Sequence, residues 1–282
     1  MTTRRTFLEV LAAGAATAAL ARRARAATAG KPPLGLQLYS LRDQLKKDVP
    51  GTLKQVKDWG FEEVETYTDF AANIAGALKD AGLRSSAMHV GYDRLQKDMS
   101  GVLKDADTLG VRTVINPYLP HKARPFASRE EIQKAAEDFA SFSTQCRAAG
   151  KRFAYHIHGQ EFGPAPEGTL FDVLAKESGP EVGFEADVFW VTVGGADPLK
   201  LMAKYPGRIW FTHLKDMSKA AAAEVPRAEY NKLNVVLGTG KIDIKGIVAA
   251  GAKAGVEMHY IEDESPDVLA QVPQSMAYYK SL

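Results

Sequence analysis

Short apolar or β-branched segments alternate with segments of helical periodicity along nearly the whole chain after residue 30. Eight segments have the length and composition of buried strands: 34–39, 63–66, 85–90, 113–116, 152–158, 182–187, 209–213 and 258–262. Helical patterns fall between them at 52–59, 72–81, 99–109, 130–149, 170–177, 198–204 and 244–254, with a last one near 266–279. Several of these patterns end in a glycine, namely Gly60, Gly82, Gly150 and Gly255, which suits the left-handed position that stops a helix.

This alternation predicts an α/β protein with a parallel sheet and right-handed crossovers. Eight strand–helix units within about 250 residues favour a closed (β/α)8 TIM barrel, formed as one domain by residues 27–282. An open doubly wound sheet is the alternative, but that fold usually carries a glycine-rich phosphate turn after its first strand, and none follows 34–39. The longest irregular segment, 218–234, is a candidate lid or substrate loop.

The first 26 residues differ in composition from the rest of the chain. Arg4 and Arg5 precede a weakly apolar run that ends at Leu20, which is the arrangement of a twin-arginine export signal. We expect cleavage near Ala26. Because the apolar run is shorter than a membrane span, we expect no stable membrane insertion afterwards. The expected partner is the twin-arginine export machinery, and the expected location is periplasmic or otherwise exported. The alternative is an N-terminal amphipathic helix or an uncut membrane anchor.

Charge and cysteine content narrow the class of protein. The chain of 282 residues has a formal net charge of +2, but five arginines against one glutamate give residues 1–26 a charge of +4, which leaves −2 on the other 256. No basic block with interleaved aromatic residues follows residue 30, which argues against nucleic-acid binding. Cys146 is the only cysteine, so an internal disulfide and a cysteine-based metal site are excluded, and its helical surroundings predict a core thiol.

Polar and charged side chains collect where the predicted strands end. They are Gln37 and Tyr39, Glu65, His89, Asn116, His156 and His158, Glu185 and Asp187, His213 with Lys215 and Asp216, and Glu262 with Asp263 and Glu264. Because the C-terminal ends of barrel strands meet at one mouth, we expect these groups to converge. Buried carboxylates and imidazoles that converge suit one divalent cation, such as Mn²⁺, Mg²⁺, Co²⁺ or Zn²⁺.

Strand periodicity sorts four of these residues by face, because side chains alternate along a strand. His156 and His158 share one face of the fifth strand, and both point to the barrel mouth in this interpretation. Glu185 and Asp187 share one face of the sixth strand. Asp187 lies nearer the strand end and is the better metal ligand, whereas Glu185 is either a further ligand or a deeper polar brace.

Other polar residues have a structural interpretation beside the functional one. His89 either contacts substrate or hydrogen-bonds within the barrel mouth. Lys215 either contacts substrate or pairs with Asp216 or Glu262, and Asp216 is also a candidate loop cap. His259 has the opposite parity to Glu262, so we expect it to face the helices.

Seven short motifs occur in the order and at the strand positions of a known family. They are 35–42 (GLQLYSLR), 60–65 (GFEEVE), 155–162 (YHIHGQEF), 184–190 (FEADVFW), 205–208 (YPGR), 213–216 (HLKD) and 260–264 (YIEDE). Together they resemble the sugar phosphate isomerase/epimerase group of xylose-isomerase-like TIM barrels, over nearly all of the chain after the signal. The resemblance implies a single divalent metal ion, with Asp187, His213 and Glu262 matched to the family's ligands on the sixth, seventh and eighth strands.

The fifth strand departs from the family pattern. Many epimerases of this group carry a glutamate ligand there, whereas this chain has the pattern Tyr-His-x-His-x-x-Glu-Phe. The fourth ligand therefore stays open among His156, His158, Glu161 and Glu185. Glu161 is alternatively matched to a glutamate that contacts substrate hydroxyls in related epimerases.

The resemblance implies proton abstraction next to a sugar carbonyl, with a metal-stabilised enediolate as the intermediate. Glu262 is the expected base on one face of the substrate, and His156 or His158 stands where an opposing base is usual. The expected substrate contacts are Glu161, Trp190, Lys215, His89 and Tyr39.

Export narrows the substrate, because phosphorylated sugars are cytoplasmic metabolites. We expect a non-phosphorylated sugar or keto-sugar. A one-sided site with a histidine acid equally suits a lyase or dehydratase acting on a keto-glycoside or an inosose-like compound. The rival from another class is an exported carbohydrate-binding barrel without catalysis, supported by the change on the fifth strand. An apurinic-site endonuclease is disfavoured, because its multi-zinc cluster needs more histidines than are well placed among the six present.

Overall fold

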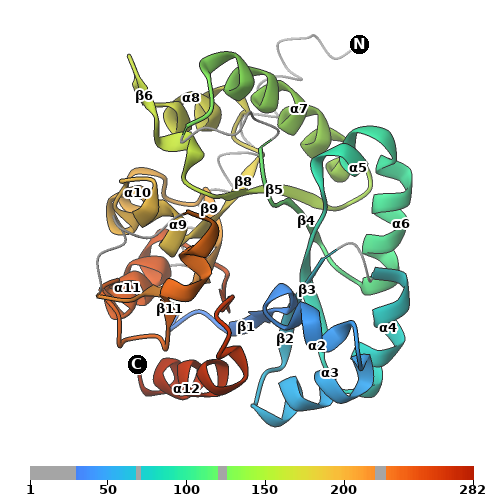
Figure 1. Cartoon of the computed structure of the whole chain (residues 1–282). Helices are drawn as coiled ribbons and strands as arrows, with labels where there is room; N and C mark the ends of the chain where they lie inside the picture. The colour runs from blue at the N-terminus through green and yellow to red at the C-terminus, as the bar shows by residue number, and fades with distance from the viewer. Residues whose placement is uncertain (1–29, 68–70, 120–125, 220–226) are drawn as a thin grey trace.

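The computed structural model describes residues 30–67, 71–119, 126–219 and 227–282, so the expected signal at 1–26 lies outside the described residues (Figure 1). Eight strands close into a barrel in the order β1-β12-β9-β8-β5-β4-β3-β2, and all their pairings are parallel. These strands are β1 (Leu34–Gln37), β2 (Glu63–Tyr67), β3 (Arg84–His89), β4 (Thr113–Asn116), β5 (Arg152–Ile157), β8 (Gly183–Asp187), β9 (Ile209–Leu214) and β12 (Met258–Ile261). The predicted (β/α)8 TIM barrel is confirmed.

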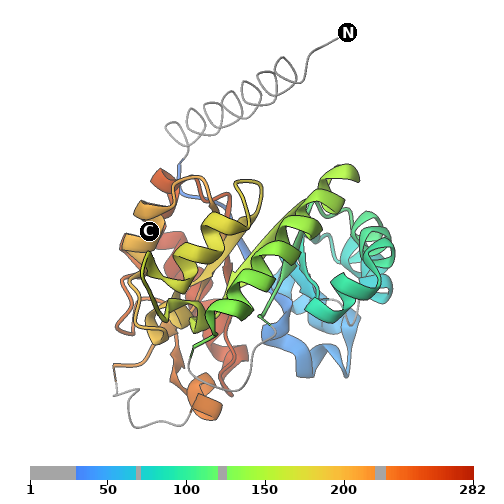
Figure 2. The same ribbon diagram turned by 90° about the horizontal axis from the view of Figure 1, so that it is seen from above.

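Helices surround the barrel, and Figure 2 shows the long helix α7 running along its outside. The main helices are α3 (Val49–Asp58), α4 (Ala71–Asp80), α6 (Met99–Leu109), α7 (Arg129–Ala148), α8 (Leu170–Glu177), α10 (Pro198–Lys204), α11 (Ile244–Ala254) and α12 (Val268–Ser281). Of these, α6, α8, α10 and α11 begin and end at the predicted residues. Three short helices were not predicted, namely α2 (Arg42–Leu45), α5 (Tyr92–Lys97) and α9 (Val188–Val193).

Local signals fix many of the helix ends. Asp48 caps α3, and Ser128 forms a reciprocal capping box with Glu131 at the start of α7. The glycines that the sequence predicts to stop helices have positive φ values between 68° and 94°; they are Gly60, Gly82, Gly150 and Gly255. The first strand ends at Gln37, two residues before the predicted end. The Gln37 side chain accepts a hydrogen bond from the Tyr39 N–H and so caps the short 3-10 helix η1 (Leu38–Leu41).

Apolar side chains close the barrel below the strand ends. This cluster contains Ala87, Ile115, Ala154, Trp210, Phe211, Met258 and Tyr260. Gly183 makes room for the Trp210 ring, since a Cβ at residue 183 would lie 2.1 Å from a ring atom. The Arg152 guanidinium covers Trp210 at 4.5 Å from its ring centroid and pairs with Glu257. The polar groups of the barrel interior lie on the other side of this apolar cluster, toward the C-terminal ends of the strands, which we call the upper part of the barrel.

The segment 218–234 is more regular than predicted, over the part that the structure describes. The turn η5 (Arg227–Leu233) leads into β11 (Asn234–Val235), which pairs antiparallel with β10 (Asp216–Met217). Asp216 holds the loop that follows by accepting hydrogen bonds from the N–H groups of Met217, Gly238, Gly240 and Ile242. The interpretation of Asp216 as a loop cap is thus confirmed, and the expectation of an irregular segment is wrong for residues 227–234.

A second small sheet and a buried cysteine complete the fold. Beyond β5, the turn η3 (Gln160–Phe162) precedes a second small sheet, formed by β6 (Pro164–Ala165) and β7 (Gly168–Thr169). Cys146 is fully buried within α7, as expected of a core thiol.

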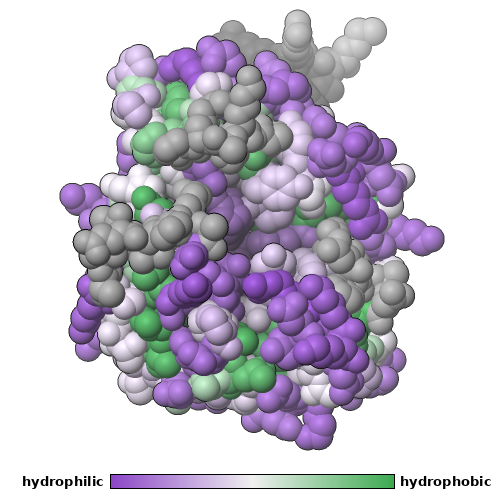
Figure 3. All heavy atoms as spheres, in the orientation of Figure 1, coloured by the Kyte–Doolittle hydropathy of each residue, from purple (hydrophilic) through white to green (hydrophobic). Residues whose placement is uncertain are grey.

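Within the described ranges, none of the helices is long and apolar enough to cross a membrane. Hydrophilic residues cover most of the face shown in Figure 3, with small hydrophobic groups between them.

Candidate metal centre

The polar side chains at the strand ends converge inside the upper part of the barrel. The cluster consists of Glu65 from β2, His89 from β3, His156 from β5, Glu185 and Asp187 from β8, His213 from β9 and Glu262 directly after β12. All are buried, with exposed fractions of 8% or less. Register explains the convergence, because parallel pairing sets Asp187 beside His213 and Glu185 beside His156.

Two overlapping groups in this cluster have the spacing of metal ligands. In the first, one oxygen or nitrogen from each of Asp187, His213 and Glu262 lies within 4.8 Å of the others. In the second, His89, His156, Glu185 and His213 meet the same limit. His213 belongs to both groups because its Nδ1 lies 3.2 Å from Glu262 Oε2, while its Nε2 lies 3.2 Å from Glu185 Oε2.

Asp187 performs two tasks with its two oxygens. Oδ1 accepts hydrogen bonds from the N–H groups of Phe189 at 2.9 Å and Trp190 at 3.0 Å, and so caps α9. Oδ2 is left facing the cluster without a hydrogen bond. Burial raises the pKa of Asp187 to about 6, although the nearby Lys215 ammonium acts in the opposite direction.

Buried carboxylate oxygens without a hydrogen bond indicate that the cluster suits a cation. Glu65 Oε1, Glu185 Oε1 and Asp187 Oδ2 have no hydrogen-bond partner within the described part of the chain, and Asp187 Oδ2 is approached by the Lys215 ammonium at 3.3 Å. A buried carboxylate oxygen without a partner costs free energy, which a bound cation would offset. Imidazole and carboxylate groups are the donors that Zn²⁺, Mn²⁺ and Co²⁺ accept. The residues therefore fit the divalent ion that the resemblance implies, with Asp187, His213 and Glu262 as its first ligands.

The three imidazoles of the cluster have different electrostatic surroundings. Burial alone would lower the pKa of His89, but the carboxylates of Glu65 and Glu185 outweigh it and raise this pKa to about 9. Burial, assisted by the charge of His213, lowers the pKa of His156 to about 4, so this ring is neutral at pH 7. Burial also opposes the charged form of His213, but the carboxylates of Glu185 and Glu262 outweigh it and raise the pKa of His213 well above its usual value. Metal ligation requires a neutral ring, so an ion bound at His213 would displace this proton.

Lys215 lies directly against the carboxylates. Its Nζ is 2.6 Å from Glu262 Oε2, 2.8 Å from Glu264 Oε1 and 3.3 Å from Asp187 Oδ2, and only 2% of the residue is exposed. These anions raise the pKa of Lys215 despite its burial, so it is a permanent cation. Of the two pairings considered for Lys215, the structure contains the one with Glu262, while Asp216 is engaged by backbone N–H groups.

Aromatic rings adjoin the cluster through His158, and a further aromatic pair lies after the first two strands. The Trp190 ring stacks on Tyr230 with centroids 6.0 Å apart and lies 5.9 Å from the His158 ring. His158 in turn contacts His156 at 4.5 Å, so the two histidines share a face as expected. Tyr39 is 41% exposed and meets Tyr67 edge to face. Such flat apolar faces suit the ring of a sugar.

Two of the residues considered in the sequence lie away from the cluster. Glu161 is fully buried behind β5, where it accepts a hydrogen bond from the hydroxyl of Tyr155, a residue of the opposite parity to His156. It is therefore not brought to the substrate side or to the ligands in this structure. His259 bonds Thr212 and lies against Gly251 of α11, which agrees with the expectation that it faces the helices.

Glu65 was recognised only as a polar strand end and was given no role in the site. The structure places its Oε2 2.7 Å from His213 Nε2 and 3.0 Å from His89 Nε2. Gln37 donates to the same oxygen at 2.6 Å. The sequence offered only a weak signal, namely Gln37 and Glu65 at the ends of neighbouring strands.

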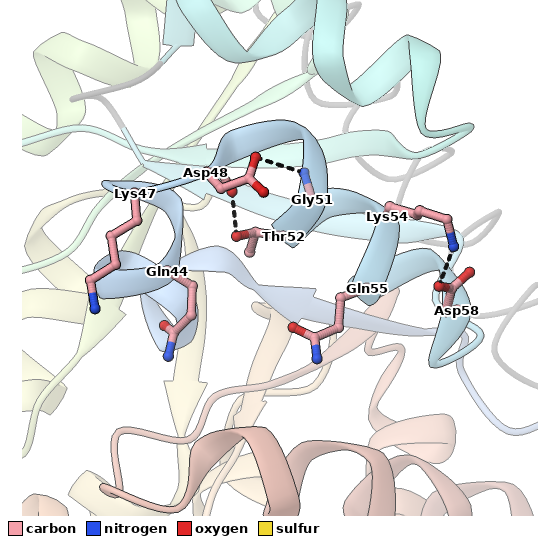
Figure 4. A pocket seen from close by; sticks show the side chains of 8 residues that line it. All are labelled: Gln44, Lys47, Asp48, Gly51, Thr52, Lys54, Gln55 and Asp58. Carbon is pink, nitrogen blue, oxygen red and sulfur yellow. Dashed lines mark hydrogen bonds and ion pairs between the residues drawn. The ribbon is translucent and has the colours of Figure 1, made fainter.

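An open hollow lies away from the buried cluster, on the outside of α2 and α3 (Figure 4). Three of its charged groups are already paired: Asp48 caps α3, and Lys54 binds Asp58 at 2.6 Å. Exposed helix pairs of this kind are common on protein surfaces. The buried cluster, rather than this open hollow, is therefore the candidate functional site.

Comparison with solved structures places the barrel among xylose-isomerase-like TIM barrels. No family model matches the chain. Proline–tRNA ligases from strains of Saccharolobus islandicus are 26% identical over 113 residues, but this match spans 39% of the chain and only about a quarter (24%) of their length. A match so partial shows no family.

Solved structures are similar over the whole barrel. A sugar phosphate isomerase/epimerase from Parabacteroides distasonis ATCC 8503 superposes with a TM-score of 0.70 and 26% identity, covering 89% of this chain and 94% of that chain. The probable 3-DHS dehydratase AsbF from Bacillus anthracis gives 0.72 at 15% identity, covering 88% and 98%. The IOLI protein with a bound zinc atom gives 0.66 at 16%, covering 88% and 95%. The last two show the fold alone. The structural neighbours are thus xylose-isomerase-like TIM barrels, among them sugar isomerases, epimerases and dehydratases.

Proposed function

We propose that the chain is a divalent-metal-dependent enzyme of the sugar isomerase/epimerase kind, acting on a non-phosphorylated sugar or keto-sugar. The observation that carries this proposal is the meeting of Asp187, His213 and Glu262 at the mouth of a barrel whose neighbours include such enzymes. Bound there, the ion would polarise a sugar carbonyl and stabilise the negative charge that develops on its oxygen.

The chain's own residues supply the proton chemistry in this proposal. Glu262 is the base on one face of the substrate. His158 is the base on the other face, where burial lowers its pKa well below the usual value and leaves a neutral ring beside Trp190 that can accept a proton. Lys215 donates to a substrate oxygen from its place against Glu262 and Glu264.

A lyase or dehydratase on the same site is the second candidate. It is favoured by one observation, namely that β5 presents His156 and His158 where related epimerases carry a glutamate. A pair of acidic and basic groups of unequal kind suits elimination next to a carbonyl, in which one group removes the proton and the other protonates the leaving oxygen.

One experiment separates these activities from simple binding. The purified protein, reconstituted with Mn²⁺, Co²⁺ or Zn²⁺, is incubated in D2O with hexoses, keto-sugars and keto-glycosides and followed by proton NMR. Deuterium next to the carbonyl with an epimeric or isomeric product supports the isomerase, and loss of the leaving group supports the lyase. If the wild-type protein binds a sugar without deuterium exchange, and the Asp187→Asn variant behaves in the same way, both activities are contradicted. The remaining function is then that of a carbohydrate-binding barrel.

Export through the twin-arginine pathway also remains our proposal, supported by Arg4, Arg5 and the run to Leu20. It is tested by fractionating cells that express the chain or its variant with lysines at positions 4 and 5. Cleavage near Ala26 in the exported fraction, and its loss in the variant, is the expected result; cytoplasmic retention of both chains would refute it.

A further inference from the structure

Two imidazoles reach from the barrel wall toward the pair of carboxylates Asp187 and Glu262. His213 Nδ1 lies 3.2 Å from Glu262 Oε2, and His156 Nε2 lies 4.0 Å from Asp187 Oδ2. The separation between two ligands of one ion, each about 2.1 Å from it, is roughly 3 to 4 Å. His213 Nδ1 therefore has the spacing of a ligand that shares an ion with Glu262 Oε2, and His156 Nε2 has the spacing of one that shares an ion with Asp187 Oδ2. His156 itself belongs to the second donor group, which it joins to the first through this contact with Asp187.

Each imidazole also has a buried carboxylate behind it. Glu65 Oε2 lies 2.7 Å from Nε2 of His213, and Glu185 Oε2 lies 2.8 Å from Nδ1 of His156. A neutral imidazole has one N–H, which a carboxylate draws to its own side and thereby leaves the opposite nitrogen with its lone pair. The two carboxylates thus favour the tautomers in which His213 Nδ1 turns its lone pair toward Glu262 and His156 Nε2 turns its lone pair toward Asp187.

His89 ties the two supporting carboxylates to each other. Its Nε2 lies 2.8 Å from Glu185 Oε2 and 3.0 Å from Glu65 Oε2, and its ring stacks on that of His213 with centroids 5.4 Å apart. Gln37 adds a hydrogen bond to Glu65 from the far side. His89 and Glu185, the two members of the second donor group that are not candidate ligands here, thereby support the imidazoles of His156 and His213.

We propose that His156 Nε2 is the fourth protein ligand, so that the ion is held by two carboxylates and two imidazoles. Glu185 positions the His156 imidazole, and Glu65 together with Glu185 positions that of His213. Glu65 and Glu185 are positioning residues, and His89 joins them instead of contacting substrate. This inference rests on the proposed metal function and deepens it. A set with two imidazoles favours Zn²⁺, Co²⁺ or Mn²⁺ and disfavours Mg²⁺, which prefers oxygen donors.

The chain offers a direct test with Co²⁺ as the probe. In proton NMR of the full chain loaded with Co²⁺, each ligating histidine contributes one strongly shifted, exchangeable N–H signal. We expect two such signals in the wild type and one in His156→Gln, with at least a ~10-fold loss of Co²⁺ affinity in a chelator competition. Glu65→Gln and Glu185→Gln are each expected to weaken binding ~10 to 100-fold. Glu65→Gln is expected to shift only the His213 signal, whereas Glu185→Gln, which contacts both imidazoles, is expected to shift the His156 signal as well.

His259→Gln is the matched control, because it removes a buried imidazole that faces the helices, and it is expected to keep both signals and full affinity. Circular dichroism verifies that each variant is folded; the glutamate variants, which preserve side-chain shape, carry the test if His156→Gln does not fold. A single signal in the wild type, or two in His156→Gln, would overturn the fourth ligand while leaving the proposed function intact. Two Co²⁺ ions per chain would overturn it in favour of a separate site at His89, His156 and Glu185. Failure to bind Co²⁺ at all would overturn both this inference and the proposed function.

Discussion

Lys215→Met tests whether the Lys215 ammonium compensates the negative charge of the buried carboxylates when no metal is bound. The Lys215 ammonium lies 2.6 Å from Glu262 Oε2 and 3.3 Å from Asp187 Oδ2, and it is almost completely buried. Methionine preserves much of the volume of the side chain but removes its charge. Removing one partner of a buried ion pair costs about 3–5 kcal/mol, which corresponds to a fall in Tm of roughly 10 °C for a domain of this size.

The assay is thermal unfolding of the wild type and of Lys215→Met, each with EDTA and with saturating Zn²⁺ or Mn²⁺. We expect the large destabilisation in EDTA and a much smaller one with metal, since a divalent cation at Asp187 and Glu262 replaces the missing charge. Lys241→Met, which removes an exposed lysine, controls for loss of a positive charge elsewhere. Equal stability of the variant and the wild type in EDTA would refute the reasoning.

Three further predictions concern the frame around the site. Gly183→Ala is expected to destabilise the barrel by about 1–3 kcal/mol, because its Cβ would lie 2.1 Å from the Trp210 ring; urea unfolding measures this, and Gly76→Ala, which has open space, is the control. Burial lowers the pKa of His259 to about 3, so the unfolded chain binds a proton that the folded chain does not below pH 6.5, and stability falls as the pH drops. This contribution is about 2 kcal/mol at pH 5, and His259→Gln is expected to remove it; an unchanged pH slope would contradict the assignment. Asp216→Asn is expected to speed amide exchange across the loop that Asp216 caps and to cost about 1–3 kcal/mol; unaltered protection would contradict the role as a cap.

The fold was predictable because its signals are local. Each main helix has an apolar stripe, and most have a cap or a stop within a few residues, as Ser128 and Glu131 provide at the start of α7. Helix α9 was missed because its cap, Asp187, reads in the sequence as the end of a strand and a metal ligand. The structure shows that one carboxylate does both, with Oδ1 on the helix and Oδ2 facing the cluster.

The site was only partly predictable, because its supporting contacts join distant strands. Strand parity correctly placed His156 and Glu185 on the inward faces of their strands, and His213 was predicted from its position at a strand end. It could not reveal that Glu65 bonds His213, which is 148 residues away in the chain. Glu161 misled for the reverse reason, since its nearness to His158 in the sequence hides that it turns back to Tyr155 on the opposite face of β5.

The most direct test of the central claim is anomalous diffraction from crystals of the protein soaked with Zn²⁺ or Mn²⁺. The account predicts one ion at about 2.0–2.3 Å from its ligand atoms, bound by Asp187, His213 and Glu262. Crystals of the Asp187→Asn variant are expected to lose most of this peak. No peak in the barrel, or an ion that contacts none of these three residues, would contradict the account.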